Sequence, residues 1–346
     1  MGMAKRKYSK RNKVEPSVQT LQLALPSTGP GATTTSYVDL SQVASLVNRR
    51  FYRQGINWAV GSMKFISATP PPGGNISGTV QVSKLWNTWV MSNSWEKGFR
   101  AWNKMNREAL AEAPSVRPKF LDFKIYADAT HHSAGFGANL LPTGITAIAA
   151  PGEWIASKYV VPDTAGAVGA VNNFEVIATG ASYPGGGASG LNAVSLIEGY
   201  ASSRGLPNIE DPNTPDDAAD ANGATPENWL SALFNDGTSQ DDQVLSDMIT
   251  ENNEAPYPFE NDGTNTDTQY PGGANQMPGL QVHDTTNYGA TTIGGTTMIK
   301  GGNFPCGLVR IDHVVAASSE THNLVLQINL IPGSHRGYLC EPMTEM

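Results

Sequence analysis

The chain has 346 residues, of which 39% are hydrophobic and 16% charged, and its net charge is −8. This length allows a sizeable core in one or two domains, and no run of about 18 apolar residues is present to predict membrane insertion. Cys306 and Cys340 are too few for a secreted disulfide scaffold, so a reducing compartment is the simpler expectation, and a single bridge between them is left open.

The net charge conceals a steep asymmetry along the chain. Residues 1–125 contain 18 Lys/Arg and 6 Asp/Glu, whereas residues 126–346 contain 5 and 25. Such a division indicates one surface that faces nucleic acid and another that faces water. Uneven decoration of the surface is the alternative interpretation.

Residues 1–16 form a short basic arm with no acidic residue before Glu15. Almost nothing apolar is present, so this segment cannot fold alone and is expected to be disordered. The predicted domains are therefore the arm, residues 1–16, and one shell domain, residues 17–346. The cations of the arm are Lys5, Arg6, Lys7, Lys10, Arg11 and Lys13.

Alternating apolar residues predict strands at Val18–Leu25, Ser45–Phe51, Asn57–Ile66 and Gly78–Leu85. A helix follows at Thr88–Ala113, before Pro114. One face of this helix carries Trp95, Phe99, Trp102 and Ala109, and the opposite face carries Lys97, Arg100, Lys104 and Arg107.

The second half of the chain has the same character, with more loops. A glycine-rich loop is expected at Tyr183–Gly190 and an irregular tail at Gly333–Met346. The predicted helices are Ala193–Ser203, Pro226–Phe234 and Ser239–Glu251. The predicted strands are Phe120–Ala127, Trp154–Val161, Phe174–Thr179, Gly279–Asp284, Thr297–Lys300, Leu308–Val315 and Asn323–Ile331.

These elements predict a mainly β fold. Strands and helices do not alternate as they do in a parallel doubly wound sheet. Many short strands joined by long loops favour an antiparallel jelly-roll β-sandwich with inserted helices, because that fold accommodates both.

Several long stretches resemble capsid proteins of circular, Rep-encoding single-stranded DNA viruses. The likeness spans nearly the whole chain. The matching stretches are Tyr37–Gly55, Thr88–Trp102, Val116–His132, Ala193–Pro215, Met248–Gly263, Gly301–Leu308 and Gly333–Met346.

The resemblance implies a single jelly roll that assembles with copies of itself into a small icosahedral shell around a circular single-stranded DNA genome. Such a shell contains a multiple of sixty copies, occurs as a virion, and is assembled in the host nucleus; the host receptor is unknown. The basic arm is shorter than the Arg-rich tails of some related coat proteins, which leaves open how much of the genome it neutralises.

The arm suits electrostatic binding of nucleic acid. Cations on a flexible tether reach many phosphates without fixed geometry, and release of counterions drives binding. Fully extended, the arm reaches about 50 Å. Six contacts with a single strand contribute about −4 to the slope of log K against log salt. The same run is compatible with a nuclear localisation signal, and a solubilising tail is the plain alternative.

A second candidate is the run Asn48–Arg53, in which Arg49, Arg50 and Arg53 are interleaved with aromatic residues. Bases stack on rings while Arg pairs with phosphate, so this composition favours single strands. On a strand, Arg49, Phe51 and Arg53 share one face. Salt bridges between subunits are an almost equal alternative.

Other charged groups give weaker signals. The basic face of the Thr88–Ala113 helix could line an interior or a subunit contact, and a solvated helix face is the favoured interpretation. The acidic loops around Asp211–Asp220 and Glu260–Asp267 offer oxygen ligands for Ca²⁺, but their spacing does not match an EF-hand loop and exposed acidic loops are the favoured interpretation. No metal or other cofactor is predicted.

No enzyme motif is complete. Asp128, His131 and His132 form only a loose cluster, and Gly187–Gly190 lacks one residue of a nucleophile elbow. The chain is therefore predicted not to be an enzyme. Three alternatives to the single-stranded DNA virus coat protein stay open: a coat protein of a small RNA virus, a carbohydrate-binding jelly-roll module, and a hydrolase on a β scaffold.

Overall fold

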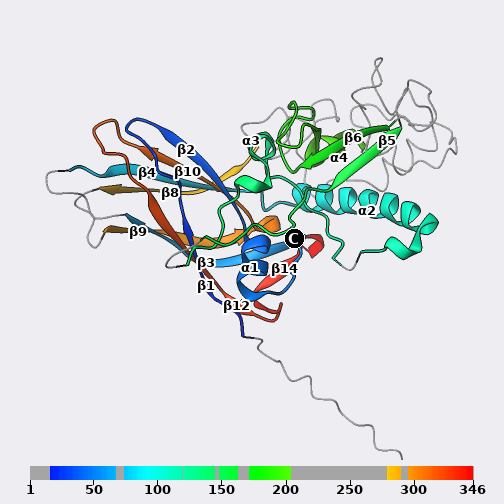
Figure 1. Ribbon diagram of the computed structural model, residues 1–346, viewed down its shortest axis with the longest axis horizontal. Helices are drawn as coiled ribbons and strands as arrows, with labels where there is room; N and C mark the ends of the chain where they lie inside the picture. The colour runs from blue at the N-terminus through cyan, green and yellow to red at the C-terminus, as the bar shows by residue number, and fades with distance from the viewer. Residues whose placement is uncertain are drawn as a thin grey trace, which may run out of the picture.

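Two antiparallel sheets form the larger of two lobes, on the left of Figure 1. This computed structural model describes residues 16–67, 74–118, 120–144, 148–162, 171–203, 279–289 and 295–345. The first sheet joins β1 (Thr20–Ala24), β11 (Leu324–Leu330) and β3 (Ile56–Ser67), and β3 also pairs with β9 (Thr296–Phe304) and β14 (Cys340–Pro342). The second sheet has the order β2 (Thr33–Asp39), β10 (Leu308–Val315), β4 (Ser77–Lys84) and β8 (Gln281–Gly289).

The pairing of these strands is nested along the chain. β1 pairs with β11, β2 with β10, β3 with β9 and β4 with β8, and each pair is antiparallel. Four strands from the first 84 residues are thus matched in reverse order by four strands from the C-terminal part of the chain.

The main hydrophobic core lies where inward-facing residues of both sheets meet. β11 alternates between buried and half-buried positions, as expected for a strand with one face on a core. Its Leu326 and Ile328 join Phe65 of the same sheet and Val82 and Ile311 of the other in one buried cluster. Complete burial of each such side chain contributes roughly 1.5–3 kcal/mol.

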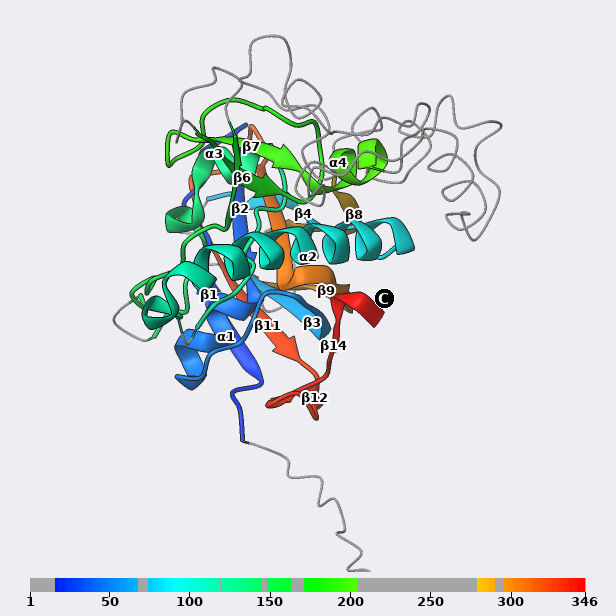
Figure 2. The ribbon, with the colours of Figure 1, turned by 90° about the vertical axis from the view of Figure 1, so that its right-hand side faces the viewer.

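A second lobe adjoins one end of the sandwich (Figures 1 and 2). It contains α2 (Trp89–Glu112) and a three-stranded sheet of β5 (Lys158–Pro162), β6 (Val171–Ile177) and β7 (Asn192–Ser195), with β6 and β7 parallel. The chain enters α4 (Leu196–Ser203) directly from β7.

The aromatic face of α2 packs into this second lobe. Trp95 and Trp102 are buried in one cluster with Phe123 and Tyr159. Gly98 allows this close packing, because a Cβ atom there would lie 2.5 Å from Leu196 Cδ2. The helix begins after Thr88, whose hydroxyl accepts a hydrogen bond from Met91 N.

Shorter elements complete the described chain. α1 (Leu40–Asn48) follows β2 directly, α3 (Ala129–Ala134) precedes the small sheet, and the tail contains a hairpin. The hairpin and the single-turn 3₁₀ helices are β12 (Pro332–Gly333), β13 (Gly337–Tyr338), η1 (Pro114–Val116), η2 (Phe136–Ala138), η4 (Pro305–Gly307) and η5 (Met343–Glu345).

The structure confirms the prediction of a mainly β fold with antiparallel sheets and inserted helices. The helix expected at Thr88–Ala113 is α2, although Ala109 of its proposed apolar face is exposed. The strands expected at Val18–Leu25, Asn57–Ile66, Gly78–Leu85, Phe174–Thr179, Gly279–Asp284, Thr297–Lys300, Leu308–Val315 and Asn323–Ile331 correspond to β1, β3, β4, β6, β8, β9, β10 and β11.

Other predictions are wrong or incomplete. Ser45–Phe51 is the end of α1 and a turn, and Phe120–Ala127 is extended chain with one isolated bridge. Only the end of Trp154–Val161 is a strand, and Ala193–Ser203 is divided between β7 and α4. β2 was not predicted, and the tail expected to be irregular contains β12, β13 and β14. The helices expected at Pro226–Phe234 and Ser239–Glu251 lie outside the described residues.

Cys306 and Cys340 are not bonded to each other. Among the described helices, none is both long and apolar enough to cross a membrane.

Candidate nucleic-acid interface

The predicted basic run forms a turn at the end of α1. Arg49 ends the helix in a left-handed conformation, with φ 53° and ψ 38°. The prediction that Arg49, Phe51 and Arg53 share one face of a strand is therefore wrong. Arg49 and Arg53 are exposed and Arg50 and Phe51 are half-buried, whereas Tyr52 is completely buried. We call residues 49–53 the basic loop.

Tyr52 anchors the basic loop to the sandwich. Its backbone N–H donates to Ser45 Oγ at 2.9 Å, and its hydroxyl donates to the Arg336 carbonyl at 3.0 Å. Its ring packs against Trp58 and Tyr338. Tyr52 thus holds the loop in place and is not available to bind a base.

The basic loop forms one side of a cleft of about 480 Å³. Three aromatic rings meet there: the centroid of Phe51 lies 5.3 Å from that of Phe120 and 6.2 Å from that of Trp154. The Lys124 ammonium lies 4.7 Å from the centroid of Trp154 and 5.6 Å from that of Phe51. The lining residues are Gln42, Ser45, Leu46, Arg49, Arg50, Phe51, Phe120, Lys124, Pro151, Gly152, Glu153 and Trp154.

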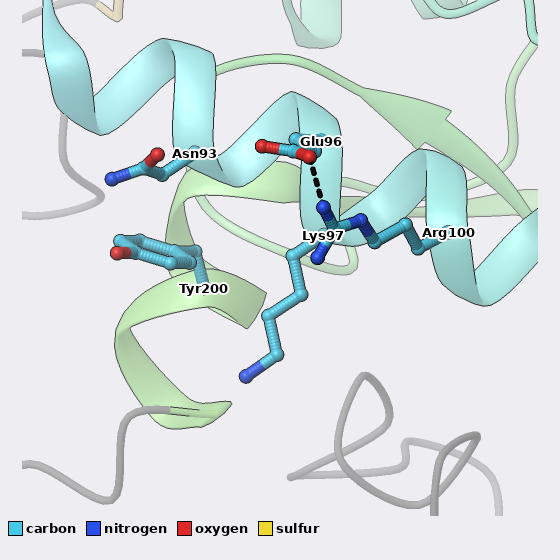
Figure 3. A pocket seen from close by; sticks show the side chains of 5 residues that line it. All are labelled: Asn93, Glu96, Lys97, Arg100 and Tyr200. Atoms are coloured by element: carbon cyan, nitrogen blue, oxygen red, sulfur yellow. Dashed lines mark hydrogen bonds and ion pairs between the residues drawn. The ribbon is translucent and has the colours of Figure 1, made fainter. Parts of the chain in front are cut away.

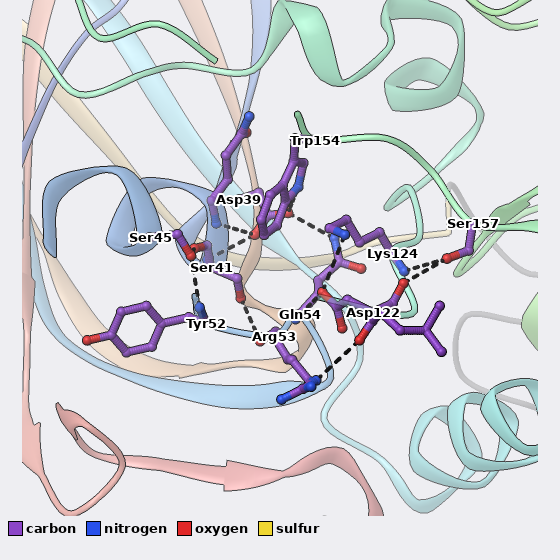
Figure 4. A network of polar contacts seen from close by, with 12 residues as sticks. Asp39, Ser41, Ser45, Tyr52, Arg53, Gln54, Asp122, Lys124, Trp154 and Ser157 are labelled. Atoms are coloured by element: carbon purple, nitrogen blue, oxygen red, sulfur yellow. Dashed lines mark hydrogen bonds and ion pairs between the residues drawn. The ribbon is translucent and has the colours of Figure 1, made fainter. Parts of the chain in front are cut away.

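A buried polar network contains residues that line this cleft, Lys124 and Trp154 among them (Figure 4). Asp39 caps α1 by accepting hydrogen bonds from Ser41 N and Gln42 N, and its Oδ2 accepts from Gln54 Nε2 and Trp154 Nε1, each at 2.9 Å. Burial raises the pKa of Asp39 to about 6, although these four donors oppose the shift. One carboxylate thus fixes the helix and the indole that lines the cleft.

Lys124 is 7% exposed and belongs to the same network. Its ammonium lies 3.8 Å from Asp122 Oδ2, and burial raises the pKa of Asp122 to about 6, against the opposing effect of the nearby Lys124 charge. The segment that carries both residues is held by Gln54, whose amide donates to the Ile125 carbonyl and accepts from Ile125 N.

Sequence reasoning did not find Phe120, Lys124 and Trp154. They lie about 70 to 105 residues after the basic loop, and no spacing rule connects them to it. The available signal was the charge of residues 117–124, which did not identify a particular lysine.

The arm cations Lys5, Arg6, Lys7, Lys10, Arg11 and Lys13 lie outside the described residues. The residues directly after the arm, from residue 17 onward, are described. Val18 N donates to Asn48 Oδ1 at 2.9 Å, and Tyr338 Oη donates to the Val18 carbonyl at 2.6 Å. Because Asn48 precedes Arg49, the arm joins the sandwich beside the basic loop.

The basic face of α2 is partly neutralised by its own acidic residues. Arg100 forms an ion pair with Glu96 (Figure 3), and the Lys104 ammonium lies 4.0 Å from Glu108 Oε1. A shallow pocket of about 360 Å³ between Tyr200 and this face is lined by both signs of charge. These pairs favour the interpretation of a solvated helix face.

The predicted histidine cluster has structural partners. Asp128 caps α3, accepts from the Tyr37 hydroxyl at 2.7 Å and pairs with Arg310. His131 lies 2.8 Å from Asn139 Oδ1, and His132 Nε2 lies 3.0 Å from Glu175 Oε2. Within the described ranges, no three His, Cys, Asp or Glu side chains form a group that fits a metal ion.

Comparisons of the chain with models of protein families, with curated proteins and with solved structures find no match.

Proposed function

We propose that the chain is a viral coat protein that assembles with copies of itself and packages single-stranded DNA. The observation that carries this proposal is the point where the chain that follows the arm joins the sandwich. Residues 17 and 18 are hydrogen-bonded beside the basic loop, so the cations of the arm directly precede, in the sequence, a point that lies next to the arginines of the loop. A surface that combines both suits a long polyanion, because it can bind phosphates with and without fixed geometry.

The topology supports the shell role. The nested orders β1-β11-β3-β9 and β2-β10-β4-β8, with β14 added to the first sheet, are those expected of a jelly roll with two Greek keys. Viral capsid domains are among the proteins that use this fold. We therefore propose that residues 17–346 form a jelly-roll shell domain. The assembly, the circular genome, the virion and the host nucleus follow from the family resemblance and belong to the same proposal.

The distribution of charge supports an orientation in the shell. The basic loop, Lys124 and Arg336 lie at one end of the sandwich: Arg336 Nη1 donates to the Phe51 carbonyl at 2.6 Å. We propose that this end faces the genome. The acidic remainder of the sequence then faces the outside or neighbouring subunits.

Negative-stain microscopy and size-exclusion chromatography of the expressed full chain test the proposal. We expect uniform closed particles of tens of subunits. A monomer or dimer that persists across a range of salt concentration and pH contradicts the coat-protein function.

Deletion of residues 1–16 tests the packaging role separately. Particles should still form, because the deleted segment precedes β1, while the nucleic acid that copurifies with them should fall. Nucleic-acid content that does not change rules out the proposed role of the arm.

A further inference from the structure

We propose that the cleft beside the basic loop binds an unpaired nucleobase together with its flanking phosphates, so that the protein distinguishes single-stranded from double-stranded nucleic acid. This inference rests on the proposed function and deepens it, because it assigns base recognition to a fixed site rather than to the arm.

The first argument is the exposure of Phe120. Phe120 is 59% exposed although it is large and apolar, and it lines the cleft with its ring against that of Phe51. Exposed apolar surface is unfavourable in water, and a stacked base would cover it. Proteins that bind single strands use such rings as platforms, because every base has a π face.

The second argument is the charge around these rings. Arg49 and Arg50 line the cleft on the side of the basic loop, and Arg53 lies 5.7 Å from the Phe51 centroid. Guanidinium groups close to the rings can bind the phosphates that flank a stacked base. Glu153 also lines the cleft, and its negative charge repels phosphates. Removal of this charge should therefore strengthen the binding of nucleic acid.

The third argument is that the site is preformed. Trp154 is held by Asp39, and the Lys124 ammonium lies close to the centroids of both the Trp154 and Phe51 rings, at 4.7 and 5.6 Å. A cleft whose lining side chains are already held in place loses little conformational freedom when a ligand binds. The volume of about 480 Å³ lies in the range of small-ligand sites.

A duplex cannot use this site in the same way. Its bases are stacked and paired inside the helix, so it offers phosphates but no exposed base face unless a base is extruded at a cost of a few kcal/mol. Single-strand preference should therefore depend on the rings and not on the arginines.

The test measures binding of a short oligothymidylate to the full chain over a series of salt concentrations, with inorganic polyphosphate and duplex DNA as probes without an available base. Phe120→Ala should weaken oligothymidylate binding about tenfold. It should leave the salt slope and polyphosphate binding unchanged, because no ionic contact is lost. Ile155→Ala is the matched control, since Ile155 is 69% exposed but does not line the cleft.

Two further variants separate stacking from charge. Phe120→Trp should retain oligothymidylate binding, and Glu153→Gln should strengthen it about twofold to fivefold through reduced repulsion. Equal weakening of oligothymidylate and polyphosphate by Phe120→Ala, or no weakening of either, overturns the inference.

The outcomes also distinguish this inference from the proposed function. If Phe120→Ala binds oligothymidylate normally while the chain still forms closed particles, the base site is wrong and the coat-protein function stands. If base-dependent binding is found and no particles form, the base site stands and the coat-protein function is wrong.

Discussion

Val18 and Asn48, which are 30 residues apart, are joined by a 2.9 Å hydrogen bond from the Val18 backbone N–H to the Asn48 side-chain oxygen. The amide nitrogen of Asn48 donates in turn to the Ala44 carbonyl and to the Tyr338 hydroxyl. One side chain therefore connects the start of β1, the end of α1 and the C-terminal hairpin. It also places Val18, which follows the arm in the sequence, beside the last residue of α1 and hence beside the basic loop.

Asn48→Ala should reduce the free energy of unfolding by about 1–2 kcal/mol, because it removes three hydrogen bonds of which some are partly buried. Limited proteolysis near Val18 should become faster, since the start of the chain loses its contact with α1. Asn48→Asp keeps the acceptor for Val18 N, so the chain near Val18 should be cleaved more slowly in this variant than in Asn48→Ala. Equal cleavage of both variants contradicts the assigned role.

Arg49 occupies a left-handed conformation that glycine adopts without steric cost. Arg49→Gly should therefore be as stable as the wild-type protein or up to about 1 kcal/mol more stable, whereas Arg49→Ala should retain the strain. Both variants should lower the salt slope of single-strand binding by about 0.7, the value for one phosphate contact. Urea denaturation and binding titrations measure the two effects. A loss of stability in Arg49→Gly contradicts the assignment of strain.

The basic loop shows why part of the site could be predicted and its geometry could not. The residue types of Arg49–Arg53 identified the segment, but the period-two interpretation of Ser45–Phe51 was wrong. Leu40, Val43, Ala44 and Val47 follow a helical spacing after the cap residue Asp39, and this pattern predicts α1 when it is read together with the cap.

The strand predicted around Lys124, at Phe120–Ala127, was wrong for a different reason. Phe123, Ile125 and Ala127 are buried as an alternating strand would require. Part of the backbone of this segment, however, bonds to side chains and not to another strand: both backbone groups of Ile125 bond to Gln54, and Lys124 N donates to Ser157 Oγ. Sequence alternation predicts extended chain and cannot predict whether another strand or a buried glutamine supplies its hydrogen bonds. The nested sheet pairs, by contrast, follow from clear apolar alternation in β10 and β11.

The exposed pairs on α2 should contribute little to DNA binding. Arg100→Gln should change the free energy of unfolding by less than about 0.5 kcal/mol, because its pair with Glu96 is a surface i,i+4 pair. The salt slope should stay unchanged, whereas Arg53→Gln in the basic loop should reduce it by about 0.7. Equal effects of the two variants would show that binding depends on total charge and not on the basic loop.

The indole of Trp154 should stabilise the protein through its hydrogen bond to the buried Asp39 carboxylate. Trp154→Phe should lower the free energy of unfolding by about 2 kcal/mol, the range for a bond to a charged acceptor. Trp86→Phe is the matched control: Trp86 Nε1 donates at 2.9 Å to the uncharged Gly279 carbonyl, and about 1 kcal/mol should be lost. Denaturation curves that give the reverse order contradict the proposed anchor.

A buried chain of hydrogen bonds in the sandwich gives the last prediction, on pH. His322 Nδ1 must donate to the Glu320 carbonyl at 2.7 Å, so in its neutral form its Nε2 accepts from Tyr288 Oη at 2.6 Å. Tyr288 Oη then accepts from His313 Nε2, and His313 Nδ1 accepts from Thr28 Oγ1 at 3.1 Å. Every group is satisfied when both histidines are neutral.

Burial, reinforced by His322, lowers the pKa of His313 from 6.5 to about 4. Between these values the unfolded chain binds more protons than the folded protein. His313 therefore removes up to about 3 kcal/mol of stability as the pH falls from 6.5 towards 4. His131, whose pKa burial lowers to about 4, acts in the same direction. Asp39 and Asp122, with pKa values raised to about 6, act in the opposite direction.

Because these contributions oppose one another, the difference between wild type and His313→Gln is more informative than the wild-type profile. Near neutral pH the variant should be less stable by about 1–2 kcal/mol, since the hydrogen-bonded chain is interrupted. As the pH falls through 6.5 towards 4 the gap should narrow and then reverse, because only the wild type must keep His313 neutral. Urea denaturation of both proteins at several pH values measures this gap. A difference in stability that is independent of pH would show that the pKa of His313 is the same in the folded and the unfolded protein.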